Sequence, residues 1–338
     1  MVGMREIVAG EFGGPEVLVL REGVEPIAGP GQVVVDVEVV DTLFVETRIR
    51  RGAARDWFPV VPPYVPGGGV AGRVASVGAG VDPAWRGRSV VTTAVVGGAY
   101  AERVAAEARG LVPVPSGLTV REAGALAYDG TTAMALYGPM RPRPGEWTLI
   151  TAAAGGMGVL LVQLARAAGS PVIAAARGER KLALLRELGA DLVVDYTLPG
   201  WADAVREATG GTGAHVVWDG AGGERGATAF ALTADGGRFS GHGAPGGGFA
   251  AADPAEAERR GIALRGIEDL QLPPEERASR LAEALDAAAA GTMRPVIGAT
   301  FPLAEAAAAH AAIEAREVTG KTLLVPSGGQ PVSPSRAI

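Results

Sequence analysis

A glycine-rich turn between an apolar strand pattern and an apolar helix pattern constrains the fold of this chain most. Thr148 to Ala152 predicts a strand, Thr151-Ala-Ala-Ala-Gly-Gly-Met-Gly158 follows, and Gly158 to Ala168 predicts a helix. Glycines between a strand and a helix let backbone N–H groups and the positive end of the helix approach a pyrophosphate. Because Ala153 stands in place of the first glycine of G-x-G-x-x-G, a tight turn without ligand is the alternative. The candidate cofactor-binding residues of this loop are Ala153, Gly155, Gly156, Met157 and Gly158.

The end of the next expected strand indicates which dinucleotide would bind. An NAD site normally carries Asp or Glu there for the ribose 2′-hydroxyl. Here Val172 to Ala176 ends in alanine, and Arg177, Arg180 and Lys181 follow. Cations suit a 2′-phosphate, so the pattern favours NADPH. A solvated start of the next helix is the alternative interpretation.

The rest of the chain divides into regions of different pattern. Up to about Val120, short β-branched runs are broken by Gly and Pro, which favours a partly open barrel or sandwich. After Arg121, strands alternate with helical patterns, which predicts a parallel sheet covered on both faces. Near the C-terminus, helices are expected at 275–290 and 302–316, and a strand at 323–326, before a frayed tail at 327–338. Further parallel strands are expected at 192–196, 216–219, 238–241 and 262–267, and the barrel strands include 17–20, 33–40, 70–77, 90–96 and 100–104.

Composition excludes several classes of protein. The 338 residues carry a net charge of −6 and no basic cluster longer than a few residues, which argues against nucleic-acid binding. With no cysteine and three histidines, neither a disulfide nor a thiolate zinc site can form. The N-terminus lacks an apolar signal core and no apolar run is long enough to span a membrane. We therefore expect a soluble cytoplasmic protein without membrane or nucleic-acid partners.

Several motifs in order resemble the zinc-independent quinone oxidoreductase and enoyl reductase branch of the medium-chain dehydrogenase/reductase superfamily. The resemblance runs from about Met4 to Val325. Its motifs are Phe44-Val-Glu-Thr-Arg-Ile-Arg-Arg-Gly52, Val65-Pro-Gly-Gly-Gly-Val-Ala-Gly72, Gly98-Ala-Tyr-Ala-Glu102, Ala125-Leu-Ala-Tyr-Asp-Gly-Thr-Thr-Ala133, Leu188-Gly-Ala-Asp191 and Thr319-Gly-Lys321. Departures include Gly69, which replaces the acid usual in the Pro-Gly-x-Glu turn, and Leu43-Phe44, which replaces an Asn-Pro pair.

The resemblance implies an α/β protein with a GroES-like, mostly-β catalytic domain and a Rossmann doubly wound nucleotide-binding domain. The expected boundaries are 1–123 for the N-terminal part of the catalytic domain, 124–270 for the Rossmann NADPH-binding domain, and 271–338 for the return to the catalytic domain with its tail. It also implies a homodimer. The residues it adds to the cofactor site, with Arg177 from the basic run, are Thr132, Lys181, Tyr196, Gly241, His242 and Gly243.

Without zinc, hydride transfer to a quinone or an activated C=C bond (an enone or enoyl group) is the chemistry that these residues suit best. The enolate formed needs hydrogen-bond donors and a proton. The candidate catalytic residues are Tyr64, Tyr128, Asp129, Thr132 and His242, and no metal site is expected. Tyr64 could instead pack in the barrel and Asp129 could be a solvated helix-end carboxylate. Two other functions stay open: a non-redox or cyclising biosynthetic step, and a nucleotide-sensing relative without enzymatic activity.

Overall fold

The computed structural model describes residues 3–55 and 57–326 and divides into two compact units. The β-rich unit comprises Met1–Thr131, Pro273–Ala289 and Pro295–Ile338. The parallel-sheet unit comprises Thr132–Leu272 and Ala290–Arg294. The tail expected to fray, 327–338, lies outside the described residues. The fold class expected from the sequence, a GroES-like unit with a Rossmann-like unit, is confirmed.

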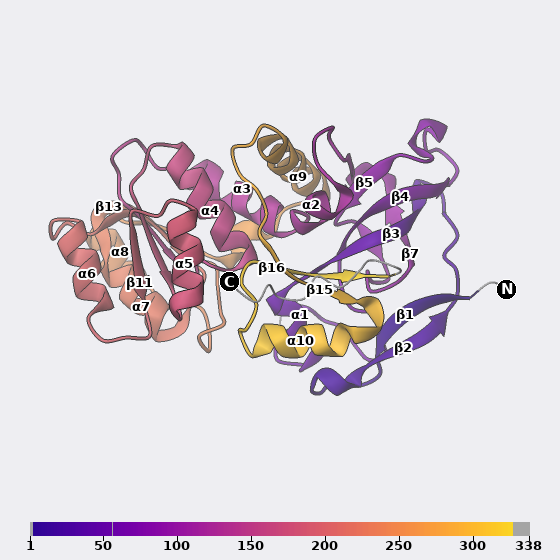
Figure 1. Ribbon diagram of the computed structural model, residues 1–338, viewed down its shortest axis with the longest axis horizontal. Helices are drawn as coiled ribbons and strands as arrows, with labels where there is room; N and C mark the ends of the chain where they lie inside the picture. Colours follow the sequence, from indigo (N-terminus) through magenta and orange to yellow (C-terminus); the bar gives the residue numbers. More distant parts are fainter. Residues whose placement is uncertain (1–2, 56, 327–338) are drawn as a thin grey trace. The chain divides into compact units, whose positions relative to one another are not determined.

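Strands from both ends of the chain build the sheet of the β-rich unit. In the described part of the chain its order is β15-β16-β3-β4-β5-β8, with β7 paired to β3 and β6 to β7 (Figure 1). The C-terminal strand β16 runs antiparallel to β3 and sets Leu323 opposite Asp41. The strands of this sheet are β3 (Gln32–Thr42), β4 (Gly69–Val77), β5 (Ser89–Thr92), β6 (Val95–Val96), β7 (Arg103–Glu107), β8 (Leu111–Pro113), β15 (Ile297–Pro302) and β16 (Lys321–Val325). A separate two-stranded sheet pairs β1 (Met4–Ala9) with β2 (Leu18–Gly23).

Valines of β3 pack one face of this sheet into a core, and Val34 and Val39 of the same strand are buried as well. Val33, Val35 and Val37 of β3 point into one core, which also contains Leu324 of β16. Four helices of four residues or more belong to this unit among the described residues, and a fifth begins in it. They are α1 (Phe44–Arg50), α2 (Val120–Ala125), α9 (Pro274–Ala289) and α10 (Ala306–Glu314), and α3 (Asp129–Met140) continues into the other unit.

The strand expected at 100–104 begins later than the sequence predicts. Gly97 and Gly98 have φ values of 83° and 116°, and the N–H groups of Ala99 and Tyr100 both bond to the carbonyl of Pro66. This turn uses the backbone groups that a ladder would need, so regular pairing starts only at Arg103. Tyr100 is nevertheless fully buried in the core.

The second unit is a parallel sheet with the order β11-β10-β9-β12-β13-β14 in the described chain. The chain runs outward from β9 on one side and then crosses over to β12, so the order reverses between β9 and β12. Ligands of such sheets bind at that reversal, beyond the carboxyl ends of the strands. The strands are β9 (Thr148–Thr151), β10 (Val172–Ala176), β11 (Leu192–Asp195), β12 (Ala214–Asp219), β13 (Thr233–Gly241) and β14 (Ala263–Arg265).

Helices cover both faces of the parallel sheet (Figure 1). Ile173 and Ala175 of β10 join a core with Val205, Phe230 and Ala257 from three helices on one face. The alternate residues of β10 are buried on the other face, where α4 and α5 pack. The helices are α4 (Gly156–Ala167), α5 (Glu179–Glu187), α6 (Trp201–Ala208), α7 (Gly223–Ala231) and α8 (Pro254–Arg259).

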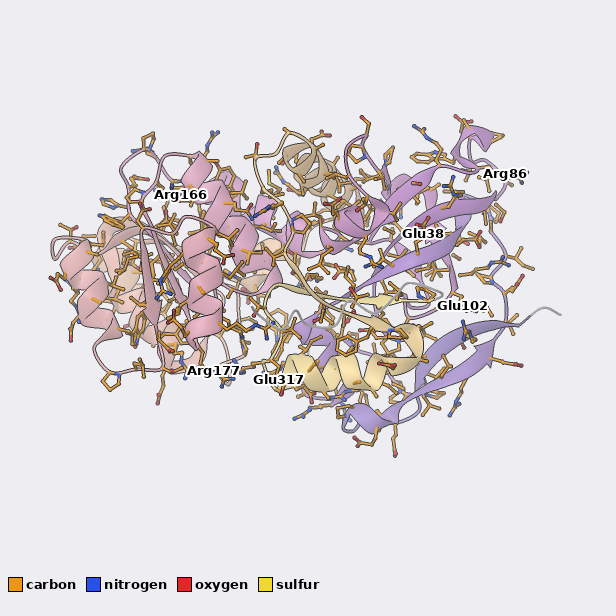
Figure 2. The ribbon with its side chains drawn as sticks, in the orientation of Figure 1. Glu38, Arg86, Glu102, Arg166, Arg177 and Glu317 are labelled. Carbon is orange, nitrogen blue, oxygen red and sulfur yellow. The ribbon has the colours of Figure 1, made fainter. Side chains whose placement is uncertain are left out.

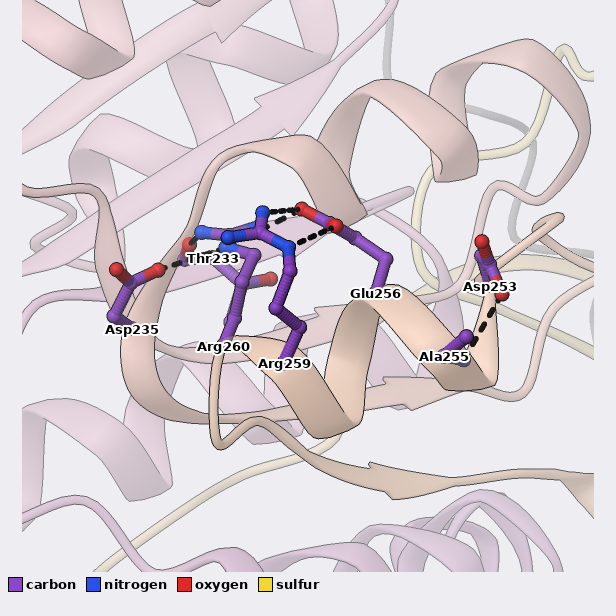
Figure 3. A network of polar contacts seen from close by, with 7 residues as sticks. All are labelled: Thr233, Asp235, Asp253, Ala255, Glu256, Arg259 and Arg260. Carbon is purple, nitrogen blue, oxygen red and sulfur yellow. Dashed lines mark hydrogen bonds and ion pairs between the residues drawn. The ribbon is translucent and has the colours of Figure 1, made fainter.

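Two aspartates of the parallel-sheet unit accept hydrogen bonds from nearby backbone N–H groups. Asp191, at the end of the Leu-Gly-Ala-Asp motif, accepts hydrogen bonds from the N–H of Val172 at 2.8 Å and from Arg166 at 3.1 Å; Arg166 is labelled on α4 in Figure 2. Asp253 caps α8 by accepting from the N–H of Ala255 (Figure 3). Short capped helices such as α8 have little apolar periodicity, which explains why the sequence did not predict it.

Among the described residues, no helix combines the length and the apolar character that a membrane crossing requires.

Candidate functional site

The glycine loop after β9 has the backbone geometry that a phosphate-binding turn needs. Ala152 has a φ of 51°, and Gly155 precedes α4 without a side-chain cap, so no described side chain caps the first N–H groups of this helix. A Cβ atom on Gly158 would lie 2.6 Å from the carbonyl oxygen of Ala153. Residue 158 must therefore be glycine, whereas Ala153 fits with a buried side chain. These features fit a dinucleotide pyrophosphate.

The expected 2′-phosphate residues follow neighbouring strands. Ala176 of β10 lies opposite Asp195 of β11, so Arg177 and Tyr196 leave the sheet side by side. The guanidinium of Arg225 lies 5.0 Å from the centre of the Tyr196 ring. The Asp195 carboxylate is already engaged in hydrogen bonds within the chain, which it accepts from the N–H groups of Gly178 at 2.7 Å and Thr197 at 2.9 Å.

A buried carboxylate joins the loops at the reversal of the sheet. Asp219, the last residue of β12, accepts from the Thr151 hydroxyl at 2.5 Å and from the N–H of Gly222. Its carbonyl accepts from the N–H groups of His242 and Gly243. Burial raises the pKa of Asp219. Asp219 thus connects the glycine loop with the segment after β13, a function that the sequence did not predict.

Three predicted residues lie at and just after the C-terminal end of β13. Gly241 lies opposite Asp219, and a Cβ atom on Gly243 would meet the carbonyl oxygen of Gly220 at 2.0 Å, so position 243 requires glycine. His242 is buried, with its Nδ1 3.3 Å from the Ser240 hydroxyl. Burial lowers the pKa of His242 to about 4, so its imidazole is neutral near pH 7. It could offer a hydrogen bond but not an imidazolium proton. Thr132, half-buried on α3, belongs to the same unit.

A charged cluster lies in the core of the β-rich unit. The ammonium of Lys321 forms an ion pair with Asp41 and a hydrogen bond of 2.9 Å to Asp129. The side chains of Lys321, Asp41 and Asp129 are 3%, 0% and 17% exposed. Burial opposes the charge of Lys321, but the two carboxylates hold its pKa above the usual value. Burial raises the pKa of Asp41 to about 6, although Lys321 acts against this shift.

A second buried network adjoins this cluster. Glu46, on α1, accepts from the N–H of Leu43 at 2.9 Å and from the Tyr100 hydroxyl at 2.6 Å. The same hydroxyl lies 2.9 Å from Nε2 of His310. Burial raises the pKa of Glu46 to about 7 and lowers that of His310 to about 3. The proximity of Asp41 raises the pKa of Glu46 further.

Tyr128 and Asp129, both predicted as catalytic, lie against the charged cluster. The N–H of Tyr128 donates to Asp41 at 2.8 Å. Its ring packs on the Pro-Gly-Gly-Gly turn, where a Cβ atom on Gly68 would lie 2.7 Å from the Tyr128 hydroxyl. Burial raises the pKa of Tyr128 to about 12, so the phenol stays protonated.

Tyr64 lies elsewhere in the same unit. Its hydroxyl is buried, has no hydrogen-bond partner among the described residues, and lies in the field of Glu46 and Arg50. Burial raises the pKa of Tyr64 to about 12. Its backbone pairs with Ala9, and its ring packs against the barrel core. These contacts favour the packing alternative over contact with a substrate.

The sequence did not single out Asp41, Glu46 or Lys321 as functional residues. One signal was available, since the chain has only two lysines and Lys321 opens the apolar strand Lys321–Val325. Asp41 and Lys321 are 280 positions apart, so only the pairing of β16 with β3 brings them together.

The described residues offer no group of three or more His, Asp or Glu side chains arranged to hold a metal ion. The three histidines are engaged separately: Nδ1 of His215 accepts from the N–H of Trp147, while His242 and His310 make the contacts given above. The residues therefore do not fit a protein-bound zinc ion.

Comparison with known proteins identifies two family profiles. Residues 29–116 match the alcohol dehydrogenase GroES-like domain, and residues 188–324 match the zinc-binding dehydrogenase profile. A 2-haloacrylate reductase from Burkholderia sp. is 32% identical over 325 residues, 93% of this chain and 96% of the relative. The quinone oxidoreductase of Mus musculus is 33% identical over 328 residues, 95% of this chain and 98% of the relative.

Solved structures agree with these relatives. A mycobacterial protein complexed with NADPH superposes with a TM-score of 0.87 at 33% identity, covering 96% of this chain and 100% of that protein. The Escherichia coli quinone oxidoreductase complexed with NADPH gives a TM-score of 0.85 at 26% identity, covering 95% of this chain and 100% of that one. With its two units and its motifs shared over nearly the full length, the chain belongs to the quinone oxidoreductase family of the medium-chain dehydrogenase/reductase superfamily.

Proposed function

We propose that the protein is an NADPH-dependent oxidoreductase that reduces a quinone or an activated C=C bond without zinc. The observation that carries the proposal is the glycine loop at the reversal of the parallel sheet, where Gly158 leaves no room for a side chain, in a chain similar throughout to quinone oxidoreductases. The 2-haloacrylate reductase supports the second substrate class, because a haloacrylate is an activated alkene.

The parallel-sheet unit would hold the cofactor. The N-terminus of α4, with Gly155, Gly156 and Met157, would bind the pyrophosphate, and Arg177, Lys181 and Tyr196 would surround the 2′-phosphate. Thr132 and the segment Gly241–Gly243 complete the proposed cofactor residues. When bound, NADPH supplies the hydride.

The residues of the chain would stabilise the charge that hydride transfer creates. Hydride addition to the β-carbon of an enone places negative charge on the carbonyl oxygen. We assign the Tyr128 phenol as the donor to that oxygen, since it stays protonated and its backbone is fixed by Asp41. Asp129 would orient the substrate. Its side chain is engaged by the Lys321 ammonium at 2.9 Å, so we assign water as the proton source for the α-carbon.

Zinc independence belongs to the same proposal and rests on the lack of a suitable ligand set in the described chain. The homodimer and the cytoplasmic location also remain predictions. The edge strand β14 is the candidate pairing edge, and light scattering of the purified protein would test the dimer.

A substrate panel tests the proposal. Chelator-treated protein is mixed with NADPH and with small 1,4-quinones, enones and 2-haloacrylates, and nicotinamide fluorescence is followed. We expect turnover of at least one class, unchanged by chelation. Binding of NADPH without turnover of any class would favour the nucleotide-sensing alternative, and loss of activity on chelation would refute zinc independence.

A further inference from the structure

The buried Lys321 is linked to two consecutive residues of the chain, directly to Asp129 and through Asp41 to Tyr128. Its ammonium hydrogen-bonds the carboxylate of Asp129 directly at 2.9 Å. It also forms an ion pair with one oxygen of Asp41, whose other oxygen accepts the N–H of Tyr128 at 2.8 Å. One ammonium therefore fixes Tyr128 and Asp129 just where α3 begins.

Building on the proposed reductase function, we propose that Lys321 and Asp41 are positioning residues that hold the Tyr128 phenol, through its backbone N–H, where it meets the substrate oxygen. Neither residue would touch the substrate. Their effect would pass through the placement of Tyr128.

Packing around Tyr128 supports this inference. Asp41 lies opposite Gly69 across the β3–β4 pair. A Cβ atom on Gly69 would lie 3.0 Å from Cδ2 of Tyr128 and 3.2 Å from Cβ of Asp41. The ring thus occupies space that side chains at 68 and 69 would fill, and the Asp41 carboxylate holds its backbone from the neighbouring strand. The ring has little freedom to shift while both constraints persist.

The energetics of the ion pair also favour a positioning function. Replacing a buried ion pair by apolar side chains is often neutral or stabilising, so fold stability alone gives little reason for it. Here the lysine is shared by carboxylates from β3 and α3, with Glu46 of α1 nearby. The arrangement specifies a geometry for the residues at the start of α3.

The cluster makes the inference measurable without a substrate. Two carboxylates (Asp41 and Asp129) contact the Lys321 ammonium, the Glu46 carboxyl group lies nearby, and Tyr100 and Tyr128 are the neutral titratable groups beside them. Burial raises the pKa of Asp41 to about 6, and Lys321 restrains that rise. The amide signal of Tyr128 should therefore move with pH near 6 as Asp41 changes protonation.

The first measurement uses the free, full-length protein labelled with ¹⁵N-tyrosine. The chain has five tyrosines, so Tyr128→Phe assigns the signal by its loss. We expect the Tyr128 amide to titrate near pH 6 in wild type, to titrate at higher pH in Lys321→Met, and not to titrate in that range in Asp41→Asn. The Asn side chain keeps an acceptor for the N–H, so this variant remains informative if Lys321→Met does not fold. An unchanged titration in Asp41→Asn would overturn the inference.

The second measurement is kinetic and uses whichever panel substrate the wild type reduces. We expect Lys321→Met to lower kcat by on the order of tenfold to a hundredfold with little change in KM, and Lys321→Arg to recover part of the loss. In a Tyr128→Phe background the same change should have almost no further effect. Glu314→Gln is the matched control, because it removes the partner of buried Arg50 in the same unit without contacting Tyr128.

The outcomes separate the inference from the proposed function. Full additivity of Lys321→Met with Tyr128→Phe, or an equal loss of kcat in Glu314→Gln, would overturn the positioning assignment while the reductase function stands. If the wild type reduces nothing, the proposed function fails, and the ¹⁵N titration still decides whether Asp41 and Lys321 control the Tyr128 amide.

Discussion

The two units place their polar groups by opposite means. In the parallel-sheet unit, the candidate phosphate site consists mainly of backbone, shaped by Gly155, Gly158 and a left-handed Ala152 within seven residues of chain. In the β-rich unit, the candidate chemistry depends on buried side chains from positions as distant as Asp41 and Lys321. A local backbone site tolerates change around it, whereas a buried charge cluster depends on every partner.

Removing the Lys321 ammonium from the buried charge cluster should give the largest effect on stability. Lys321→Met leaves Asp41 buried without its counter-charge, so we expect the free energy of unfolding to fall by about 3–5 kcal/mol. Urea denaturation near pH 7 measures this loss. In the double variant Lys321→Met/Asp41→Asn, most of the lost unfolding free energy should be recovered. If it is not, the uncompensated charge of Asp41 is not the cause of the loss.

Glu46 of the β-rich unit should dominate the pH dependence of the unfolding free energy. Burial raises the pKa of Glu46 from 4.5 to about 7, so the folded state retains a proton that the unfolded state releases. This contribution is complete below about pH 4.5 and is lost as pH rises through 7. It amounts to on the order of 3 kcal/mol. We expect Glu46→Gln to flatten the fall in unfolding free energy between pH 4.5 and about 7, the range bounded by these two values.

Exposed carboxylates provide the control for this profile. Glu275→Gln, at an exposed position of α9, should keep the wild-type slope. A Glu46→Gln profile with the full wild-type slope would show that another group controls the pH dependence.

The backbone site should be sensitive at one glycine and tolerant at its neighbour. Gly158→Ala would set a Cβ atom 2.6–2.7 Å from backbone oxygens, which we expect to cost about 1–3 kcal/mol and to abolish NADPH binding. Gly155→Ala meets only one atom, at 3.4 Å, and its φ of −81° suits alanine. Urea denaturation should find near-wild-type stability for Gly155→Ala and a loss for Gly158→Ala. Equal losses in the two variants would contradict the steric argument.

Cofactor choice should give the smallest change. Lys181→Ala removes one proposed cation at the 2′-phosphate, so the Kd for NADPH should rise about tenfold, as expected for one charge-assisted hydrogen bond. The Kd for NADH should hardly change. Equal losses for both cofactors would refute the phosphate contact.

Local pattern and long-range contact explain how much the sequence could predict. The strand Val172–Ala176 agrees with its prediction, and α4 begins within two residues of its expected start, because apolar runs and glycines act over short distances. The strand start at Arg103 was missed because a carbonyl of Pro66 accepts two N–H groups there. The Asp41–Lys321 pair depends on strand register across almost the whole chain, which no local pattern contains.

Transfer of a labelled hydride tests the central claim most directly. Chelator-treated protein is given NADPH deuterated at the transferring position of the nicotinamide, together with an enone that it turns over, and the product is examined by NMR. The account predicts one deuterium at the β-carbon and solvent hydrogen at the α-carbon. A product without deuterium at the β-carbon, or no reaction until zinc is restored, would contradict it.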